Sequence, residues 1–183
     1  MAKPFHTTDY SFRAATVNDV DAIAKLVQSA YRGDSSRAGW TTEADLLDGQ
    51  RTDVTAITTL LNSSANGLLL CECNNTLLAS AHLERNGSVC HFGMFAVQPA
   101  MQNHGIGRAL LAEAERIARD DWQCEEMHML VITLRSELIA WYQRRGYSRL
   151  GVFKPFPYGD ARFGLPKRED LRLEALSKPL ANP

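Results

Sequence analysis

The spacing of apolar residues near the start of the chain predicts one short strand followed by a helix. Residues 11–15 have extended character, and Thr16 and Asp19 then have the form of a capping box, with Asp in place of the usual Glu. Apolar residues recur at helical spacing from there to Tyr31, and Gly33 is expected to end the helix.

The pattern then passes from a polar stretch to a second helix and a group of strands. Residues 34–50 are polar and irregular, and helical spacing returns at residues 53–61. Asn74-Asn75 and Asn86-Gly87 are typical of tight hairpin turns. Between these signals we expect three strands, at residues 67–73, 76–84 and 88–97.

The second half of the chain alternates between helix and strand. An apolar stripe with charged residues opposite it predicts an amphipathic helix over residues 105–119. The apolar run 127–132 predicts a strand buried on both faces. A short helix and two strands complete the predicted order βααβββαβαββ, at residues 136–145, 147–153 and 170–176.

A glycine-containing loop lies between the third of the grouped strands and the amphipathic helix. Gln102, Gly105 and Gly107 follow Pro99, which ends the strand. Backbone N–H groups and the helix dipole at such a junction favour an anion, above all a phosphate or pyrophosphate. The loop is not a P-loop, because no Lys-Ser/Thr pair follows the second glycine. It is not a dinucleotide fingerprint either, because Leu110 stands where the third glycine belongs. A plain strand-to-helix turn without ligand is the alternative.

The spacing Gln-x-x-Gly-x-Gly between an apolar strand and a helix resembles the acyl-CoA-binding motif of the GNAT superfamily of N-acetyltransferases. Residues 141–147 resemble its second motif, and the resemblance is strongest over residues 91–111 and 136–150. It implies a single domain over residues 1–183 of class α/β (α+β). The implied sheet is mixed, mostly antiparallel and flanked by helices, with its fourth and fifth strands splayed apart to admit the donor.

The resemblance also implies a reaction and a set of donor contacts. Acetyl-CoA is the implied donor, with direct transfer to a primary amine of a small molecule in a ternary complex and no metal. The amide of Phe95 would polarise the thioester carbonyl, and Arg108 either adds charge or is an ordinary solvated residue. The expected donor-binding residues are Phe95, Ala96, Val97, Gln102, Asn103, His104, Gly105, Ile106, Gly107, Arg108, Ala109 and Tyr142.

Tyr142 is the side chain that we expect to act as general acid towards the CoA sulfur. It lies four residues before Gly146, as in the second family motif, and the pKa of a phenol, near 10, suits a thiol leaving group. A tyrosine packed on an amphipathic helix is the alternative. Arg135 stands where many family members carry a cofactor-binding asparagine, so that contact is not expected.

Several residues are candidates for the general base. By its position four residues before Phe95, His91 matches a catalytic glutamate of some family members, and imidazole titrates near neutrality. A histidine with a purely structural role is the alternative. Other bases that the strands offer are Glu72, His82 and Glu84, and a chain of waters would need no dedicated base.

Two variable segments are candidates for acceptor binding. Residues 37–51 contain an acidic and aromatic set suited to a cationic amine, namely Trp40, Glu43, Asp45 and Asp48. The proline- and aromatic-rich loop 155–164 contains Phe156 and Tyr158. This loop either lines the acceptor pocket or packs against another subunit, so a homodimer is one possible assembly.

Composition narrows the class of protein without naming the acceptor. The chain has 183 residues, 45% hydrophobic content and a formal net charge of −1, which does not favour nucleic acid or a membrane as partner. The N-terminus lacks the apolar core of a signal peptide, so we expect a cytoplasmic protein. Four cysteines without C-x-x-C spacing indicate buried, reduced thiols. A catalytically silent acyl-CoA sensor and a protein or peptide acetyltransferase are the rival functions.

Overall fold

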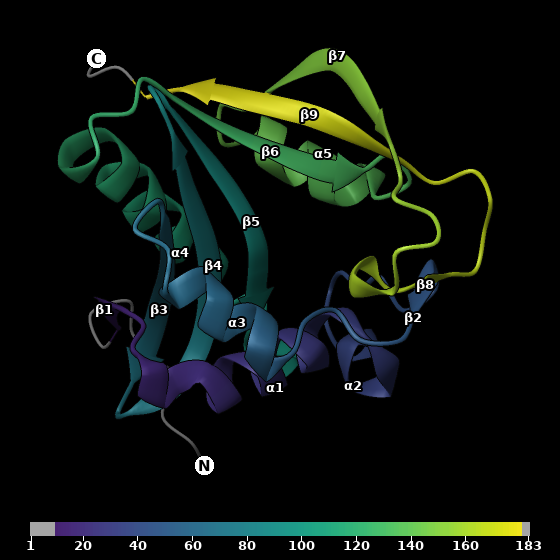
Figure 1. Cartoon of the computed structure of the whole chain (residues 1–183), viewed down its shortest axis with the longest axis horizontal. Helices are drawn as coiled ribbons and strands as arrows, with labels where there is room; N and C mark the ends of the chain where they lie inside the picture. The colour runs from purple at the N-terminus through teal and green to yellow at the C-terminus, as the bar shows by residue number, and fades with distance from the viewer. Residues whose placement is uncertain (1–9, 181–183) are drawn as a thin grey trace.

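A seven-stranded sheet with the strand order β1-β3-β4-β5-β6-β9-β7 forms the centre of the molecule (Figure 1). The computed structural model describes residues 10–180. All neighbouring strands are antiparallel except β5 and β6, which are parallel. The strands are β1 (Ser11–Ala14), β3 (Asn66–Cys73), β4 (Thr76–Asn86), β5 (Val89–Val97), β6 (Glu126–Ile132), β7 (Ser148–Pro155) and β9 (Arg172–Pro179). The predicted fold class is confirmed.

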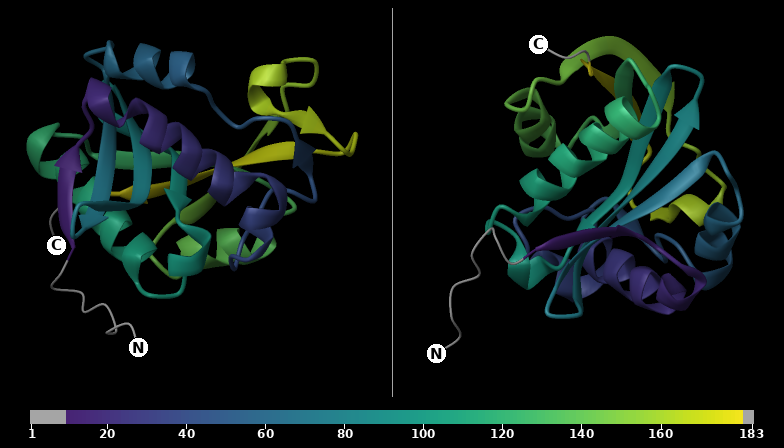
Figure 2. Two further views of the ribbon diagram at one scale, coloured as in Figure 1. Left: turned by 90° about the horizontal axis from the view of Figure 1, so that it is seen from below. Right: turned by 90° about the vertical axis from the view of Figure 1, so that its left-hand side faces the viewer.

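Helices cover both faces of this sheet (Figure 2). One face carries α1 (Val20–Tyr31) and α3 (Val54–Leu61), and the other carries α4 (Ile106–Arg116) and α5 (Ser136–Gln143). Short helical turns are η1 (Val17–Asp19), η2 (Pro99–Met101), η4 (Ala161–Phe163) and the π-helical η3 (Ile117–Asp121). The segment 34–50, expected to be irregular, instead contains α2 (Gly33–Arg37) and β2 (Leu47–Asp48), and β2 pairs with β8 (Leu165–Pro166).

Local signals in the sequence are confirmed where they depend on neighbouring residues alone. The Thr16 N–H donates to Asp19 Oδ2 over 2.7 Å, as the capping box requires. Asn74 and Asn75 both have positive φ, 49° and 60°, the conformation of a type I′ hairpin turn. Gly33, two residues after the end of α1, has φ of +68°, and α2 begins at that residue.

Two separate hydrophobic cores lie on the two faces of the sheet. The core on the α1 side joins α1 and α3 to β3, β4 and β5. The core on the α4 side joins α4 and α5 to both halves of the sheet and also holds the four cysteines, all buried and unbridged. Because the helices bury their apolar faces on opposite sides, the sheet itself sets the distance between the two layers.

The parallel pair β5–β6 separates after three residues. Pairing covers Val89 with Glu126, Cys90 with Met127 and His91 with His128. Beyond His91 the two strands diverge (Figure 1), so the second half of β5 has no strand partner on that side among the described residues. β5 and β6 correspond to the fourth and fifth strands of the predicted order, so the predicted splay is confirmed.

A β-bulge lies in the second half of β5, which pairs with β4 but not with β6. Gly93 pairs with His82 and Ala96 with Ser80, so two residues, Met94 and Phe95, face a single residue of β4. Met94 takes φ of +44°, which is unusual for a residue other than glycine. Bulges of this kind re-aim side chains next to functional sites.

The bulge exchanges the faces of the strand. Cys90 and Phe92 pack in the core on the α4 side, whereas Met94 and Ala96 pack in the core on the α1 side. Phe95 therefore turns towards α4. Strict alternation along residues 88–97 does not predict this exchange.

The expectation that residues 127–132 are buried on both faces is wrong. Met127, Met129 and Val131 are buried against α4 and α5, while Leu130 is 44% exposed. The physical reason is that the core on the α1 side contains no buried residue of β6, since α1 and α3 cover only the other half of the sheet.

The outer strand β7 is exposed along its whole length. It pairs with β9 on one side, and its register shifts between Arg149 and Phe153, around Gly151 with φ of +66°. This edge of the sheet is consequently bent rather than flat.

Candidate active site

The glycine loop ends in the first turn of α4. Gly105 is the residue before the helix and has φ of +84°, a conformation that glycine adopts without strain. The first N–H groups of a helix lack partners within it, so they point outwards at this place. The Ala109 N–H is not available to bind an anion, because it donates to the Gly105 carbonyl over 3.0 Å. Ile106 contributes only backbone, since its side chain is buried.

Gly107 is required for the close approach of α4 to β5. A Cβ atom at this position would lie 3.2 Å from Cζ of Phe95 and 3.8 Å from the Trp141 ring. At Gly105, in contrast, an added Cβ meets nothing within 4 Å. The second glycine of the motif therefore seats the helix, and the first one makes the turn.

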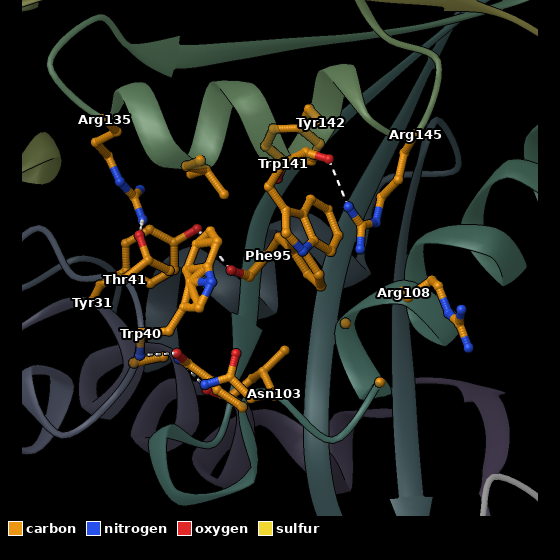
Figure 3. Close-up of a pocket in the computed structure, with 16 residues that line it drawn as sticks. Tyr31, Trp40, Thr41, Phe95, Asn103, Arg108, Arg135, Trp141, Tyr142 and Arg145 are labelled. Atoms are coloured by element: carbon orange, nitrogen blue, oxygen red, sulfur yellow. Dashed lines mark hydrogen bonds between the residues drawn. The ribbon is translucent and has the colours of Figure 1, made fainter.

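A pocket with a volume of about 360 Å³ opens beside this helix start, on the side where β5 and β6 diverge (Figure 3). Its residues come from α1, from the loop after α2, from β5, from the glycine loop and the start of α4, and from α5 with its two flanking turns. The lining residues are Ala30, Tyr31, Trp40, Thr41, Phe95, Val97, Gln102, Asn103, Gly105, Gly107, Arg108, Arg135, Leu138, Trp141, Tyr142 and Arg145. Ala96, His104, Ile106 and Ala109, expected among the donor contacts, are not part of the lining.

The Gln102 side chain joins the loop after α2 to the end of β5. Its Oε1 accepts from the Trp40 N–H over 2.7 Å, and its Nε2 donates to the Val97 carbonyl over 3.4 Å. Both ends of the amide thus have protein partners. The exposed His104 bonds through Nδ1 to the Gln102 carbonyl, 2.8 Å away.

Tyr142 lies on the inner face of α5 and is only 4% exposed. Its ring makes edge contacts with Trp141 and Tyr147 at centroid distances of 5.1 and 5.7 Å. Burial raises the pKa of this phenol well above its ordinary value, and the nearby Tyr31 adds to the effect. The hydroxyl is protonated at neutral pH and can donate its proton, but the raised pKa makes it a weaker acid than the ordinary phenol that matches a thiol leaving group.

Phe95 offers its backbone to the pocket at the bulge. Its carbonyl already accepts a hydrogen bond of 3.0 Å from the Tyr31 hydroxyl. Its ring packs on Trp141, with the centroids 6.1 Å apart. Tyr31 was not among the residues that the sequence singled out.

His91 lies at the closed end of the splay rather than in the pocket lining. Its ring contacts His128 edge-on at 6.0 Å, and His128 Nε2 is 2.5 Å from Glu126 Oε2. None of the other expected bases lines the pocket either. Glu72 is paired with Arg13, and His82 is bonded to Asn66 at 2.8 Å.

The structure does not assemble the acidic set expected for a cationic acceptor. Glu43 is buried between Arg32 and Arg135, at 2.6 and 2.8 Å. Burial opposes its ionisation, but Arg135, Arg32 and Arg51 outweigh burial and lower the pKa of this carboxyl. Outside the pocket, Asp45 pairs with Arg37 and Asp48 pairs with Lys167. Of the expected set only Trp40 lines the pocket.

The loop 155–164 is fixed to the segment around β2. Phe156 is buried against Leu47, Ile132 and Leu171 in a small third core. The Tyr158 hydroxyl donates to the Arg168 carbonyl over 3.1 Å and accepts from the Leu171 N–H over 2.7 Å. Neither aromatic side chain is part of the pocket lining.

Sequence reasoning missed, as a feature of the site, the pairing of Trp141 on the last turn of α5 with Arg145, which follows the end of that helix. The Arg145 guanidinium lies 3.4 Å from the centroid of the Trp141 ring and donates to the Trp141 carbonyl over 2.7 Å. The i, i+4 spacing of the two residues was the available signal. No comparable local signal links Arg135 and Thr41, which are 94 positions apart and bonded at 2.9 Å.

The fold and the site together define an acyltransferase-type architecture, a splayed mixed sheet with a glycine loop at the opening. The profile of the Acetyltransferase (GNAT) family matches residues 22–147 of the chain. The chain belongs to this family, and it is an N-acetyltransferase-type acyltransferase. Comparison with curated proteins finds no significant match.

Solved structures of N-acetyltransferases share the fold at low sequence identity. The ribosomal-protein-S18-alanine N-acetyltransferase from Escherichia coli has a TM-score of 0.70 at 13% identity, with 95% of this chain and 96% of that chain covered. An N-acetyltransferase from Staphylococcus aureus Mu50 has a TM-score of 0.69 at 19% identity, with 94% and 99% covered. A mutant of the spermidine N-acetyltransferase from Vibrio cholerae has a TM-score of 0.69 at 12% identity, with 95% of each chain covered.

Residues 10–180 contain neither a membrane-spanning helix nor a cluster of metal ligands. None of the helices there combines the length and the apolar character needed to cross a bilayer. In the same residues no three His, Cys, Asp or Glu side chains come together as a metal site would require.

Proposed function

We propose that the protein transfers the acetyl group of acetyl-CoA directly to a primary amine of a small molecule. The observation that carries this proposal is that one pocket contains the start of α4, the bulged part of β5 and Tyr142. These are the parts that a thioester needs: an anion site, a polarising backbone and a proton donor.

The residues at the α4 end of the pocket fit a phosphorylated donor. Free N–H groups begin at the glycine loop, and Arg108 and Arg145 line the same side. The Arg145 Nε is buried without a hydrogen-bond partner among the described residues, and burial lowers the pKa of this guanidinium, with Arg144 and Arg108 adding to the effect. An anion held between Arg108 and Arg145 would offset both the missing hydrogen bond of the Arg145 Nε and the cost of burying its charge near other arginines.

In the proposed reaction each atom has a stated destination. The amine nitrogen bonds to the thioester carbonyl carbon, polarised by the Phe95 amide, and the carbon–sulfur bond breaks. Tyr142 gives its proton to the sulfur, so that CoA leaves as a thiol. The amine loses one proton to water, because His91 lies outside the pocket lining, and Tyr142 regains one from solvent.

A small acceptor suits this pocket better than a protein substrate does. The pocket is of the size that a drug-sized ligand fills. The loop 155–164 is held in place by Phe156, which packs against Leu47 of β2, and by Tyr158, which bonds to Arg168 and Leu171. A catalytically silent sensor would need the glycine loop but would have no use for a protonated phenol beside it.

Acceptor screening with acetyl-CoA tests this function. The protein is mixed with acetyl-CoA and a panel of primary amines, and CoA release is followed with a thiol reagent. We expect saturable thiol release with at least one small amine. Tight acetyl-CoA binding without thiol release from any amine would favour the sensor, and release only with peptide amines would favour a protein acetyltransferase.

A further inference from the structure

The ionised side chains that line the pocket are all positive. Three of its lining residues are arginines, and none is aspartate or glutamate. Figure 3 places Arg108 and Arg145 on one side of the pocket and Arg135 on the other, with Phe95 and Trp141 between them. Donor phosphates at the start of α4 account for the first two arginines and leave Arg135 without an assigned role.

Positive charge is in excess around Arg135. Glu43 is shared between Arg135 and Arg32, so one carboxylate faces two guanidinium groups. The guanidinium of Arg51 lies 5.2 Å from the centroid of the Tyr31 ring and also acts on Glu43. The nearby carboxylates of Asp45 and Asp48 are paired elsewhere. This end of the pocket therefore disfavours a polycationic acceptor.

Arg135 also has unused hydrogen-bonding capacity. Its Nη1 donates to Glu43 Oε1 over 2.8 Å and its Nη2 to Thr41 Oγ1 over 2.9 Å. Its Nε is buried without a hydrogen-bond partner among the described residues. A guanidinium offers five N–H groups in a rigid fork that matches a carboxylate, so a ligand oxygen is the natural partner for the remaining donors.

We propose that the acceptor is an amine that itself carries an anionic group, in the simplest case the carboxylate of an amino acid, and that Arg135 binds this group. The proposal rests on the proposed function and names its substrate class. It replaces the cationic acceptor that the acidic residues of segment 37–51 had suggested. With the anionic group on the Trp40 and Thr41 side, the amine is directed towards Phe95 and Tyr142.

Matched sets of acceptors test the substrate class on the unmodified protein. Each set contains an amino acid, its primary amide and its decarboxylated amine, and spermidine serves as the cationic probe. With saturating acetyl-CoA, we expect kcat/KM for the best amino acid to exceed that of its amide and its amine by at least about tenfold. Equal or higher kcat/KM for the uncharged or cationic members would overturn the proposal.

Calorimetric titration of the same compounds into the CoA-saturated protein separates this inference from the proposed function. A preference for the carboxylate form in binding, without any thiol release, would support the substrate class and refute the transferase activity. Thiol release from many amines without that preference would refute the substrate class alone.

Substitution of Arg135 then assigns the contact. We expect Arg135→Gln to raise KM for the amino acid by about tenfold or more, while KM for acetyl-CoA stays within about twofold. Arg135→Lys keeps the charge but not the forked guanidinium, so its KM for the amino acid should lie between those of the wild type and Arg135→Gln. Arg37→Gln, at an exposed ion pair outside the pocket, is the control. An unchanged KM for the amino acid in Arg135→Gln would refute the contact, and if this variant does not fold, the matched acceptors still decide the substrate class.

Discussion

The two ends of the pocket are built in different ways. The proposed donor end is built mainly from one continuous stretch, the end of β5, the glycine loop and the start of α4, and Arg145 adds a side chain from a distant segment. The proposed acceptor end consists of side chains from distant segments, held together by Glu43 between Arg32 and Arg135. A site built from backbone requires particular residues at fixed spacing, so it leaves a recognisable short motif in the sequence. A site built from ion pairs between distant segments leaves no such motif in any one of them.

Of the substitutions that test this difference, removal of the Glu43 carboxylate should have the largest effect, and it should act on stability. Glu43→Gln leaves two buried guanidinium groups without their counter-charge, and we expect a loss of about 3–5 kcal/mol in the free energy of unfolding. Denaturant unfolding measures it. Asp45→Asn, which removes a carboxylate from an exposed pair, should cost less than about 1 kcal/mol. Similar losses in the two variants would mean that the buried network contributes no more than a surface ion pair.

The same carboxyl gives a pH dependence. The pKa of Glu43 is lower in the folded protein than its ordinary value of 4.5, because the three arginines outweigh burial. Its contribution to stability is therefore complete above that value and is lost as the pH falls through the folded pKa. The difference in unfolding free energy between the wild type and Glu43→Gln should shrink between pH 7 and pH 3. A constant difference would contradict the lowered pKa.

At the donor end, the largest effect should follow from filling the close approach of α4 to β5. In Gly107→Val the added atoms meet the rings of Phe95 and Trp141, so α4 must move and acetyl-CoA affinity should fall by about 100-fold. Calorimetry measures the affinity, and circular dichroism checks the fold. Gly93→Ala is the control, since a Cβ there meets nothing within 4 Å.

Between the two ends, Tyr142 reports on the chemical step. Tyr142→Phe removes the proton donor while keeping the buried ring, so kcat should fall by about 10- to 100-fold and KM for acetyl-CoA should change little. Tyr147→Phe is the matched control. The Tyr147 hydroxyl bonds to Glu115 over 2.9 Å, away from the pocket, so this variant should lose stability but not kcat. An equal kcat in Tyr142→Phe would make Tyr142 a packing residue.

The smallest effect should come from the amide that connects the two ends. Gln102→Ala removes the acceptor of the Trp40 N–H, and the loss of about 1 kcal/mol should raise KM for both substrates by about fivefold. Gln98→Ala, which removes a side-chain hydrogen bond to the Leu77 carbonyl outside the pocket, should leave both KM values unchanged. A change in only one KM would show that Gln102 serves one end alone.

The fold and the donor end were open to prediction from sequence because their signals are local. Apolar spacing, hairpin dipeptides and the glycine loop each depend on neighbouring residues. Even there, the roles of single residues differ in detail. The Gln102 side chain holds Trp40, and Gly107 makes room for Phe95, since both roles depend on segments that the fold brings alongside.

The acceptor end was not predictable for the same physical reason. The sequence places Glu43 in an acidic stretch, but its charge is balanced by Arg135, which is 92 positions away. The β5 bulge likewise has no local signal. Positive φ is usually indicated by glycine or asparagine, but here a methionine, Met94, adopts it. Phe156 is aromatic and lies in a loop, yet it is buried because Leu47 and Leu171 come to meet it.

The exposed edge strand β7 has a consequence for the behaviour of the protein in concentrated solution. Leu150, Val152 and Phe153 are 44 to 50% exposed on an outer strand, a composition that invites chain-to-chain pairing and precipitation. The shifted register around Gly151 bends the strand and interrupts such pairing. Straightening this edge, for instance by replacing Gly151 with a β-branched residue, would trade colloidal stability for a more regular sheet.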